Sequence, residues 1–139
     1  MHRIRLLTLA LCAAGTTLAA QTPPQADTAH PAAAGPAVEA VLTRGLNGHE
    51  PADTVTAVPD SVGALYLWTR VSGAAGDTVH HVWFHGDTQV ADVALAVGGS
   101  PWRTWSKKTI PSDWTGAWRV EVRDASGAVL KRVDFTVGP

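Results

Sequence analysis

The sequence predicts an all-β fold, an immunoglobulin-like antiparallel β-sandwich of about seven strands, with a small β-barrel as the alternative. Three observations support this prediction. From Val38 onward, apolar and polar residues alternate in short runs, which is the period of a strand with one buried face. Gly, Pro, Asp and Asn residues, which favour turns, separate these runs. Seven runs with such turn spacing are typical of a sandwich, although the Cys–Trp–Cys arrangement of antibody domains is absent.

Each predicted strand combines an alternating pattern with a flanking turn signal. The last strand is the clearest, because Val129, Val133, Phe135 and Val137 share one face. Arg132 and Asp134 point to the other face, so this strand belongs to a sheet with one buried side. The seven predicted strands span residues 38–46, 64–71, 78–85, 89–97, 102–110, 117–123 and 129–137.

Two segments precede the predicted domain, which spans residues 38–139. Residues 1–20 have the form of a cleavable secretory signal peptide, with a basic start, an apolar run over 6–14 and a small-residue exit. Residues 21–37 form a Pro/Ala-rich linker without large aliphatic residues, which predicts disorder. The apolar run is shorter than the roughly 20 residues that span a bilayer, so we expect no stable membrane insertion after cleavage. The predicted protein is exported, either to the periplasm or to the extracellular space.

Composition excludes several classes of function. The 11 Lys and Arg residues are balanced by 12 Asp and Glu residues, and no basic stripe is present, so we expect no nucleic-acid partner. Cys12 is the single cysteine and lies inside the predicted signal peptide. The exported chain therefore contains no thiol for a disulfide, a thiolate metal site or a cysteine nucleophile.

An ordered series of aromatic motifs resembles a known bacterial family. The series comprises LYLWT at 65–69, HVW at 81–83, WRTWSKK at 102–108, WTGAWRV at 114–120 and DASG at 124–127. It resembles the family called domain of unknown function 2914, over about residues 38–137. Members of that family are attached to envelope or membrane-anchored bacterial proteins and have no agreed activity. The resemblance therefore implies a location in the cell envelope and transfers no catalytic residue.

The histidines do not form a predicted metal site. His81 and His85 share a strand face but lie about 13 Å apart at ~3.3 Å per residue, and His80 faces the opposite side. One of them could still pair with His49 or with an Asp of another strand, a possibility that the sequence leaves open. We predict no metal site and no cofactor.

No catalytic residue is predicted either, so we expect a protein that is not an enzyme. Ser106 stands beside Lys107 and Lys108, but neighbours in a strand point to opposite faces and no second base is evident. Most Asp residues lie beside Gly, Pro or Ser and are typical of turns. Glu121, two residues from Arg119 and from Arg123, indicates an exposed charged face of a sheet.

The tryptophans are the strongest candidates for a ligand surface. Tyr66 and Trp68 share one strand face while Leu65 and Leu67 share the other, so the two aromatic side chains are expected to face away from the core. Trp rings next to His, Arg and Lys suit stacking on a sugar or on a partner's side chain.

Two further tryptophans have contrasting settings. Trp105 lies between Arg103 and Lys107, whereas Trp118 shares a face with Val120 and other core residues and is expected to be buried. Burial of the remaining rings under a loop is the alternative to an exposed platform. The predicted ligand-binding residues are Tyr66, Trp68, His81, Trp83 and His85.

These observations favour a secreted or periplasmic non-catalytic binding module of the bacterial cell envelope. Its expected partner is an envelope glycan or an envelope protein. One alternative is a structural adaptor that docks onto another envelope protein through a sheet edge. A hydrolase acting on envelope glycans is the third interpretation.

The predicted signal peptide makes a direct prediction about the exported protein. Its N-terminus is expected near Ala20 or Gln21, because the small-residue exit follows the apolar run. N-terminal sequencing and intact mass of exported material measure this position. A start at Met1, or a mass that includes an acylated Cys12, would contradict the prediction.

Overall fold

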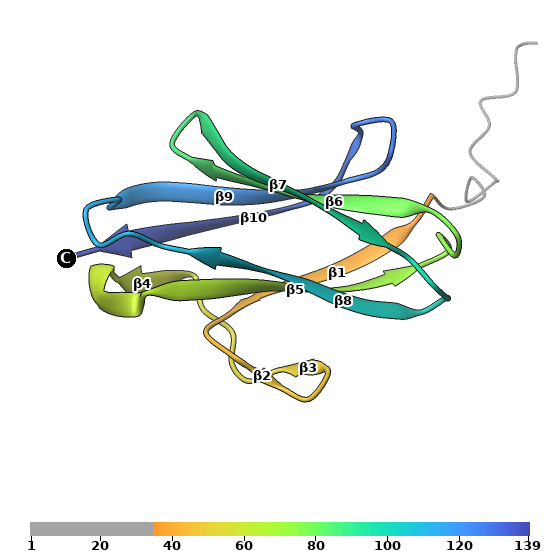
Figure 1. Ribbon diagram of the computed structural model, residues 1–139, viewed down its shortest axis with the longest axis horizontal. Helices are drawn as coiled ribbons and strands as arrows, with labels where there is room; N and C mark the ends of the chain where they lie inside the picture. Colours follow the sequence, from red (N-terminus) through yellow and green to blue (C-terminus); the bar gives the residue numbers. More distant parts are fainter. Residues whose placement is uncertain (1–34) are drawn as a thin grey trace, which may run out of the picture. The chain divides into compact units, whose positions relative to one another are not determined.

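The computed structural model describes residues 35–139 and consists there of two open β-sheets packed face to face (Figure 1). The predicted β-sandwich is therefore confirmed, and because both sheets end in free edges, the barrel alternative is wrong. The predicted signal peptide and almost all of the predicted linker lie outside the described residues.

The smaller sheet has three antiparallel strands in the order β1-β5-β8. β1 spans Ala37–Thr43, β5 spans Ala64–Ser72 and β8 spans Trp102–Thr109. Leu65, Leu67 and Val71 of the central strand β5 are fully buried, so this face of the sheet forms one wall of the core.

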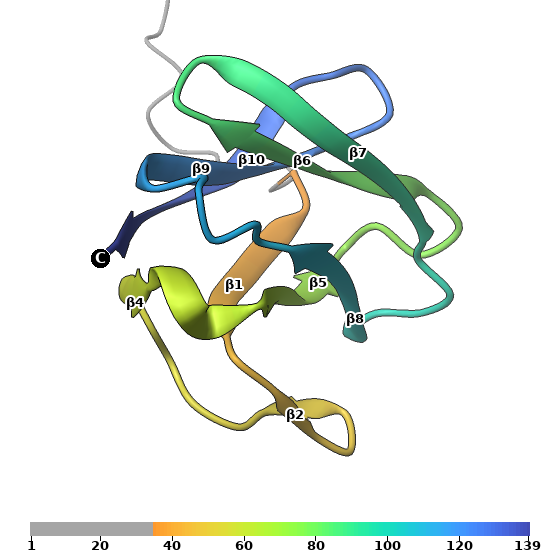
Figure 2. The same cartoon turned by 60° about the vertical axis from the view of Figure 1, so that its left-hand side comes forward.

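The larger sheet has five strands in the order β4-β10-β9-β6-β7. The short β4 pairs in parallel with β10, and the other pairs are antiparallel. The strands span Ala57–Pro59 (β4), Thr78–His85 (β6), Thr88–Ala96 (β7), Gly116–Arg123 (β9) and Val129–Gly138 (β10). β7 and β8 are thus edge strands of different sheets, on the same side of the sandwich (Figure 2).

The order of the long strands resembles that of an immunoglobulin domain. Numbered along the chain, the seven long strands are β1, β5, β6, β7, β8, β9 and β10, and they divide as 1-2-5 and 7-6-3-4. As in immunoglobulin domains, A, B and E lie in one sheet and G, F and C in the other, but the fourth long strand, β7, pairs next to C and not with E. The seven predicted strands are the seven long strands, and their bounds agree with the structure to within one or two residues, except at the end of the first strand.

The segment between β1 and β5 differs from the prediction. β1 ends at Thr43, and a small hairpin of β2 (Leu46–Asn47) and β3 (Glu50–Pro51) follows, then β4 and the 3₁₀ turn Asp60–Val62. These elements are two or three residues long, too short for an alternating pattern to be visible. β4 also depends on pairing with β10, which is distant in sequence.

Asp53 closes the loop that carries the hairpin. Its carboxylate accepts hydrogen bonds from the Arg44 backbone N–H (2.9 Å), the Thr43 hydroxyl (2.7 Å) and the Arg44 guanidinium (2.6 Å). These bonds lower the pKa of Asp53 to about 2, the backbone N–H having the largest effect. Asp53 thus holds the two ends of the hairpin loop together.

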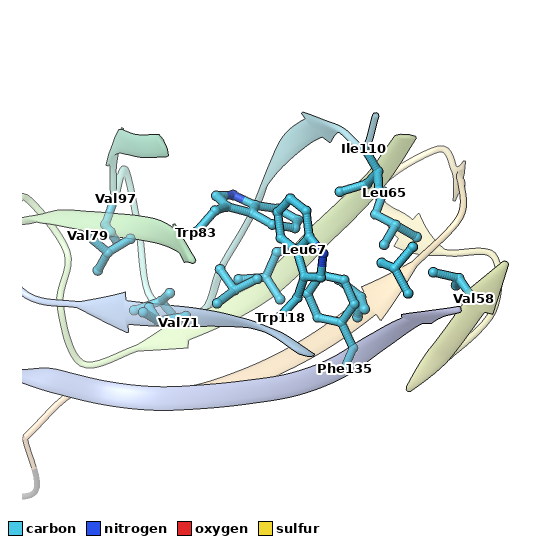
Figure 3. Packing of buried hydrophobic residues seen from close by; sticks show 14 of the residues in the cluster. Val58, Leu65, Leu67, Val71, Val79, Trp83, Val97, Ile110, Trp118 and Phe135 are labelled. Atoms are coloured by element: carbon cyan, nitrogen blue, oxygen red, sulfur yellow. The ribbon is translucent and has the colours of Figure 1, made fainter. Parts of the chain in front are cut away.

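The core is built around three aromatic rings contributed by the larger sheet. Trp83 meets Phe135 edge to face at 6.3 Å, and Phe135 stacks on Trp118 at 5.8 Å (Figure 3). Trp83 lies on the third long strand, where immunoglobulin domains place their buried tryptophan. The prediction that Trp118 belongs to the core is confirmed, since only 2% of it is exposed.

Replacing Trp118 with alanine is expected to cost about 3–5 kcal/mol of unfolding free energy, because the cavity cannot be refilled in a close-packed core. The matched control is Trp102→Ala, at a site that is 39% exposed, with an expected cost below about 1 kcal/mol. Chemical denaturation followed by circular dichroism measures both values. Similar losses for the two variants would contradict this account of the core.

Candidate functional site

The five predicted ligand-binding residues do not form one exposed surface. Trp68, His81 and Trp83 are 2%, 0% and 0% exposed, and only Tyr66 and His85 are partly accessible. The expectation of an exposed Trp68 and Trp83 is therefore wrong. Three different environments account for their positions.

Trp68 faces away from the core, as its register predicts, but it is covered from outside. The β2–β3 hairpin lies on the outer side of the three-stranded sheet (Figures 1 and 2). The indole Nε1 of Trp68 donates a 2.7 Å hydrogen bond to the His49 carbonyl of this hairpin. Burial under a loop is thus the observed outcome for Trp68. Tyr66, on the same face, stays half-buried with the Lys107 Nζ 5.7 Å from its ring centre.

His81 and Trp83 face inward from β6 and join a buried chain of hydrogen bonds. Trp83 Nε1 donates to Ser106 Oγ at 3.1 Å, and Ser106 Oγ lies 2.8 Å from His81 Nδ1. On the other side of the ring, His81 Nε2 lies 3.2 Å from Thr69 Oγ1, which donates to the Thr104 carbonyl. Because the Thr69 hydroxyl donates its proton to that carbonyl, its oxygen can only accept a hydrogen bond from His81. His81 therefore donates from Nε2 and accepts from the Ser106 hydroxyl at Nδ1. Every buried polar side-chain atom in this series of hydrogen bonds has a partner.

The Ser106–His81 pair has the spacing of a nucleophile and its base, but not the accessibility. Ser106 is 4% exposed and His81 is fully buried, between the two sheets. A substrate has no path to the hydroxyl in this arrangement. The pair instead links β8 of the smaller sheet to β6 of the larger one.

His85 belongs to an aromatic group at the opposite end of β6. Its ring stacks on Trp114 with centres 5.4 Å apart and meets Trp118 at 4.8 Å, and its Nε2 lies 2.8 Å from the Thr115 carbonyl. Lys108 Nζ lies 5.7 Å from the Trp114 ring centre. His85 is therefore separated from Tyr66 and Trp68, which lie on the outer face of the other sheet.

The predicted exposure of Glu121 is also wrong. Glu121 was expected on an exposed face, but it is only 7% exposed, because Arg119 and Arg123 cover it. Arg119 Nε donates to Oε1 at 3.0 Å and Arg123 Nε donates to Oε2 at 2.8 Å, while the Arg119 guanidinium lies 3.9 Å from the Phe84 ring centre. Burial raises the pKa of Glu121, but the hydrogen bonds from Arg123 and Arg119 outweigh it, so that the pKa is lower than usual.

A groove of about 630 Å³ lies at the side of the sandwich where β7 and β8 form the sheet edges. It combines three aromatic rings with small apolar side chains and one guanidinium. The lining residues are His49 of the hairpin, 94–96 of β7, Pro101, and 102–105 of β8. This groove is the candidate functional site.

The aromatic rings of the groove are held by specific neighbours. Trp102 lies against the backbone of the loop before β8, where a Cβ on Gly98 would come within 2.8 Å of the indole. Glycine at position 98 therefore allows the ring to lie on this loop. Trp105 is half-buried and meets the His49 ring edge at 5.7 Å. Arg103 is held by Glu50 of the hairpin, with 2.5 Å between Nε and Oε1.

Sequence reasoning noted Trp105 between two cations but did not predict the groove. The WRTW motif and the preceding Gly-Gly pair are visible signals. However, the groove also needs His49, and it needs the edges of two different sheets on one side. Both come from tertiary structure.

Two other kinds of site are absent from the part of the chain that the structure describes. No group of three or more His, Cys, Asp or Glu side chains in residues 35–139 is arranged to hold a metal ion. In the same residues, no helix has the length and apolar character needed to cross a membrane.

The fold and the groove together define a small immunoglobulin-like β-sandwich with an aromatic groove at one edge. Residues 76–137, from just before β6 to the end of β10, match the family described as "Protein of unknown function (DUF2914)". This segment of the chain is therefore similar to that family, in agreement with the resemblance inferred from the sequence. The motif at 65–69 lies outside the matched residues.

No curated protein matches this chain. Among solved structures, the chain is similar to a crystal structure of an engineered protein, with 21% identity and a TM-score of 0.42. The similarity covers 77% of this chain and 20% of that one, so the chain spans a fifth of the length of its structural neighbour.

The buried His81 predicts a specific dependence of stability on pH. Burial lowers its pKa from 6.5 to about 4, so the unfolded chain binds a proton more readily than the folded one. Above pH 6.5, His81 is neutral in both states and does not change the free energy of unfolding. As the pH falls from 6.5 toward 4, protonation of His81 in the unfolded chain lowers the free energy of unfolding, by roughly 3 kcal/mol in total. Denaturant unfolding at a series of pH values measures the loss.

His81→Gln removes the titrating group and is expected to flatten this part of the pH profile. His80→Gln is the matched control, because His80 is on the opposite face of β6, beside Asp92 at 2.7 Å. A profile that stays equally steep in His81→Gln would show that other groups cause the acid sensitivity.

Proposed function

We propose that the protein is an exported, non-catalytic binding module of the bacterial cell envelope, and that its ligand occupies the groove between β7 and β8. The observation that carries the proposal is the position of Trp102. Of the large apolar side chains in residues 35–139, only Trp102 and Val129 are exposed, and Trp102 lies in the groove beside Trp105 and His49. Exposed aromatic rings in a concave site are typical anchors for ligands.

Export and envelope location rest on separate support. Residues 1–20 have the features of a signal peptide, and the resemblance carried by the aromatic motifs implies an envelope location. A non-catalytic role is favoured because the serine–histidine pair of the described chain lies inside the core. The groove itself offers rings, one guanidinium that is already paired, and threonine, which suit binding rather than bond cleavage.

The proposal is tested with two alanine variants of the full exported protein, Trp102→Ala and Trp105→Ala. Each is expected to bind its envelope ligand roughly thirtyfold more weakly, since a stacking anchor contributes about 2 kcal/mol or more. Retention on purified peptidoglycan, envelope polysaccharide and envelope protein fractions measures the binding, after circular dichroism has established the fold. Gly98→Ala is a subtler variant, because the added methyl group displaces the Trp102 ring without removing it.

Trp114→Ala provides the control, since Trp114 is a partly buried tryptophan outside the groove. It is expected to bind like the parent. The proposal is wrong if the parent is retained on none of the three fractions, or if the groove variants are retained as well as Trp114→Ala.

A further inference from the structure

One edge of the sandwich is open to the addition of another strand. β8 pairs with β5 along its whole length, from Val71–Trp102 to Ala64–Thr109, and among residues 35–139 it has no partner on its other side. Alternate backbone N–H and C=O groups of an edge strand point away from the sheet. An extended polypeptide can bind these groups by continuing the sheet.

The charge of β8 selects the kind of strand that fits. β8 carries Arg103, Lys107 and Lys108 and no acidic residue, although the whole chain has a net charge of −1. In the described part of the chain, only Arg103 of these three forms an ion pair, with Glu50. Lys107 and Lys108 each have Nζ 5.7 Å from an aromatic ring centre, and Lys108 Nζ also donates a 3.1 Å hydrogen bond to the Thr109 carbonyl. Lys107 is exposed, so its ammonium group can reach a carboxylate of a neighbouring strand.

The same cations disfavour a second copy of this chain at the edge. Pairing of β8 with another β8 would bring like charges onto adjacent strands, which is destabilising. β7, across the groove, has only Asp92 as a charged residue, and Asp92 is bound to His80. The cationic edge of β8 therefore favours an acidic strand from a different protein.

The positions of the two groove tryptophans suit an added strand. Trp102 lies opposite Val71, which faces the core, whereas Trp105 lies opposite Trp68, which faces outward. The two indoles therefore project from opposite faces of β8. An added strand also alternates its side chains between two faces, so each indole can cover one set of them.

From these observations we propose that the groove binds an extended acidic segment of a partner protein, which adds to the edge of β8 as a fourth strand of the three-stranded sheet. This inference rests on the proposed function and names the partner class of the same site.

The probe for the test is a capped peptide with the length of β8, in which Glu and Val alternate. When it binds, hydrogen exchange is expected to slow at the outward-pointing amides of residues 102–109, whereas the amides of β1 stay unchanged. Lys107→Glu is expected to weaken binding roughly fivefold, because it reverses one exposed charge next to the peptide. Lys131→Glu, on the exposed surface of β10 in the other sheet, is the matched control and is expected to have no effect.

Three further ligands separate the possible outcomes. A peptide with Lys in place of Glu tests charge, a Glu/Val peptide with a central Pro tests strand pairing, and a soluble polyuronate tests an acidic glycan. The inference predicts that only the unmodified acidic peptide binds and protects β8. It is overturned if the acidic peptide does not bind, if the proline peptide binds equally well, or if polyuronate protects the groove in its place.

The two proposals can fail separately. If Trp102→Ala and Trp105→Ala lose retention on envelope fractions but the acidic peptide does not bind, the groove remains the ligand site and the strand-addition inference is wrong. If those variants keep full retention, the proposed function itself is wrong.

Discussion

The hydrogen bond between the Trp83 indole and Ser106 is a buried polar link between the two sheets of the sandwich. It joins β6 of the larger sheet to β8 of the smaller one, because Trp83 Nε1 donates to Ser106 Oγ and His81 binds the same oxygen. The chain contains no cysteine beyond position 12, so no disulfide can link these sheets. Aromatic packing and a fully satisfied polar chain take that role, and they leave no buried polar side-chain atom unpaired in the described residues.

This link also determines where the groove lies. By holding β8 against β6, it places the free edge of β8 next to the end of β7 and opens the groove between them. The polar residues of the core are therefore important for the site although they do not line it. The hairpin contributes from outside, since His49 contacts both Trp68 and Trp105. Core, hairpin and groove form one connected arrangement.

Local patterns predicted most of the fold. Alternation located all seven long strands, because burial of one face imposes a period of two on any half-buried strand. It also assigned Leu65 and Leu67 to the core and Trp118 with them. The short elements between residues 44 and 63 were missed, since β2, β3 and β4 contain too few residues to show a period, and β4 forms only by pairing with the distant β10.

Neighbouring residues along the chain were sufficient to predict the seven long strands, the inward faces of β5 and β9 and the family resemblance. Which outward faces are exposed depends on contacts between residues that are distant in sequence. Trp68 and Glu121 both point away from the core, yet a hairpin covers one and two arginines cover the other. The groove was decided in the same way, because it exists only where edges of two sheets and a distant hairpin meet. Alternation reports the direction of a side chain, whereas its exposure depends on what the rest of the chain places in front of it.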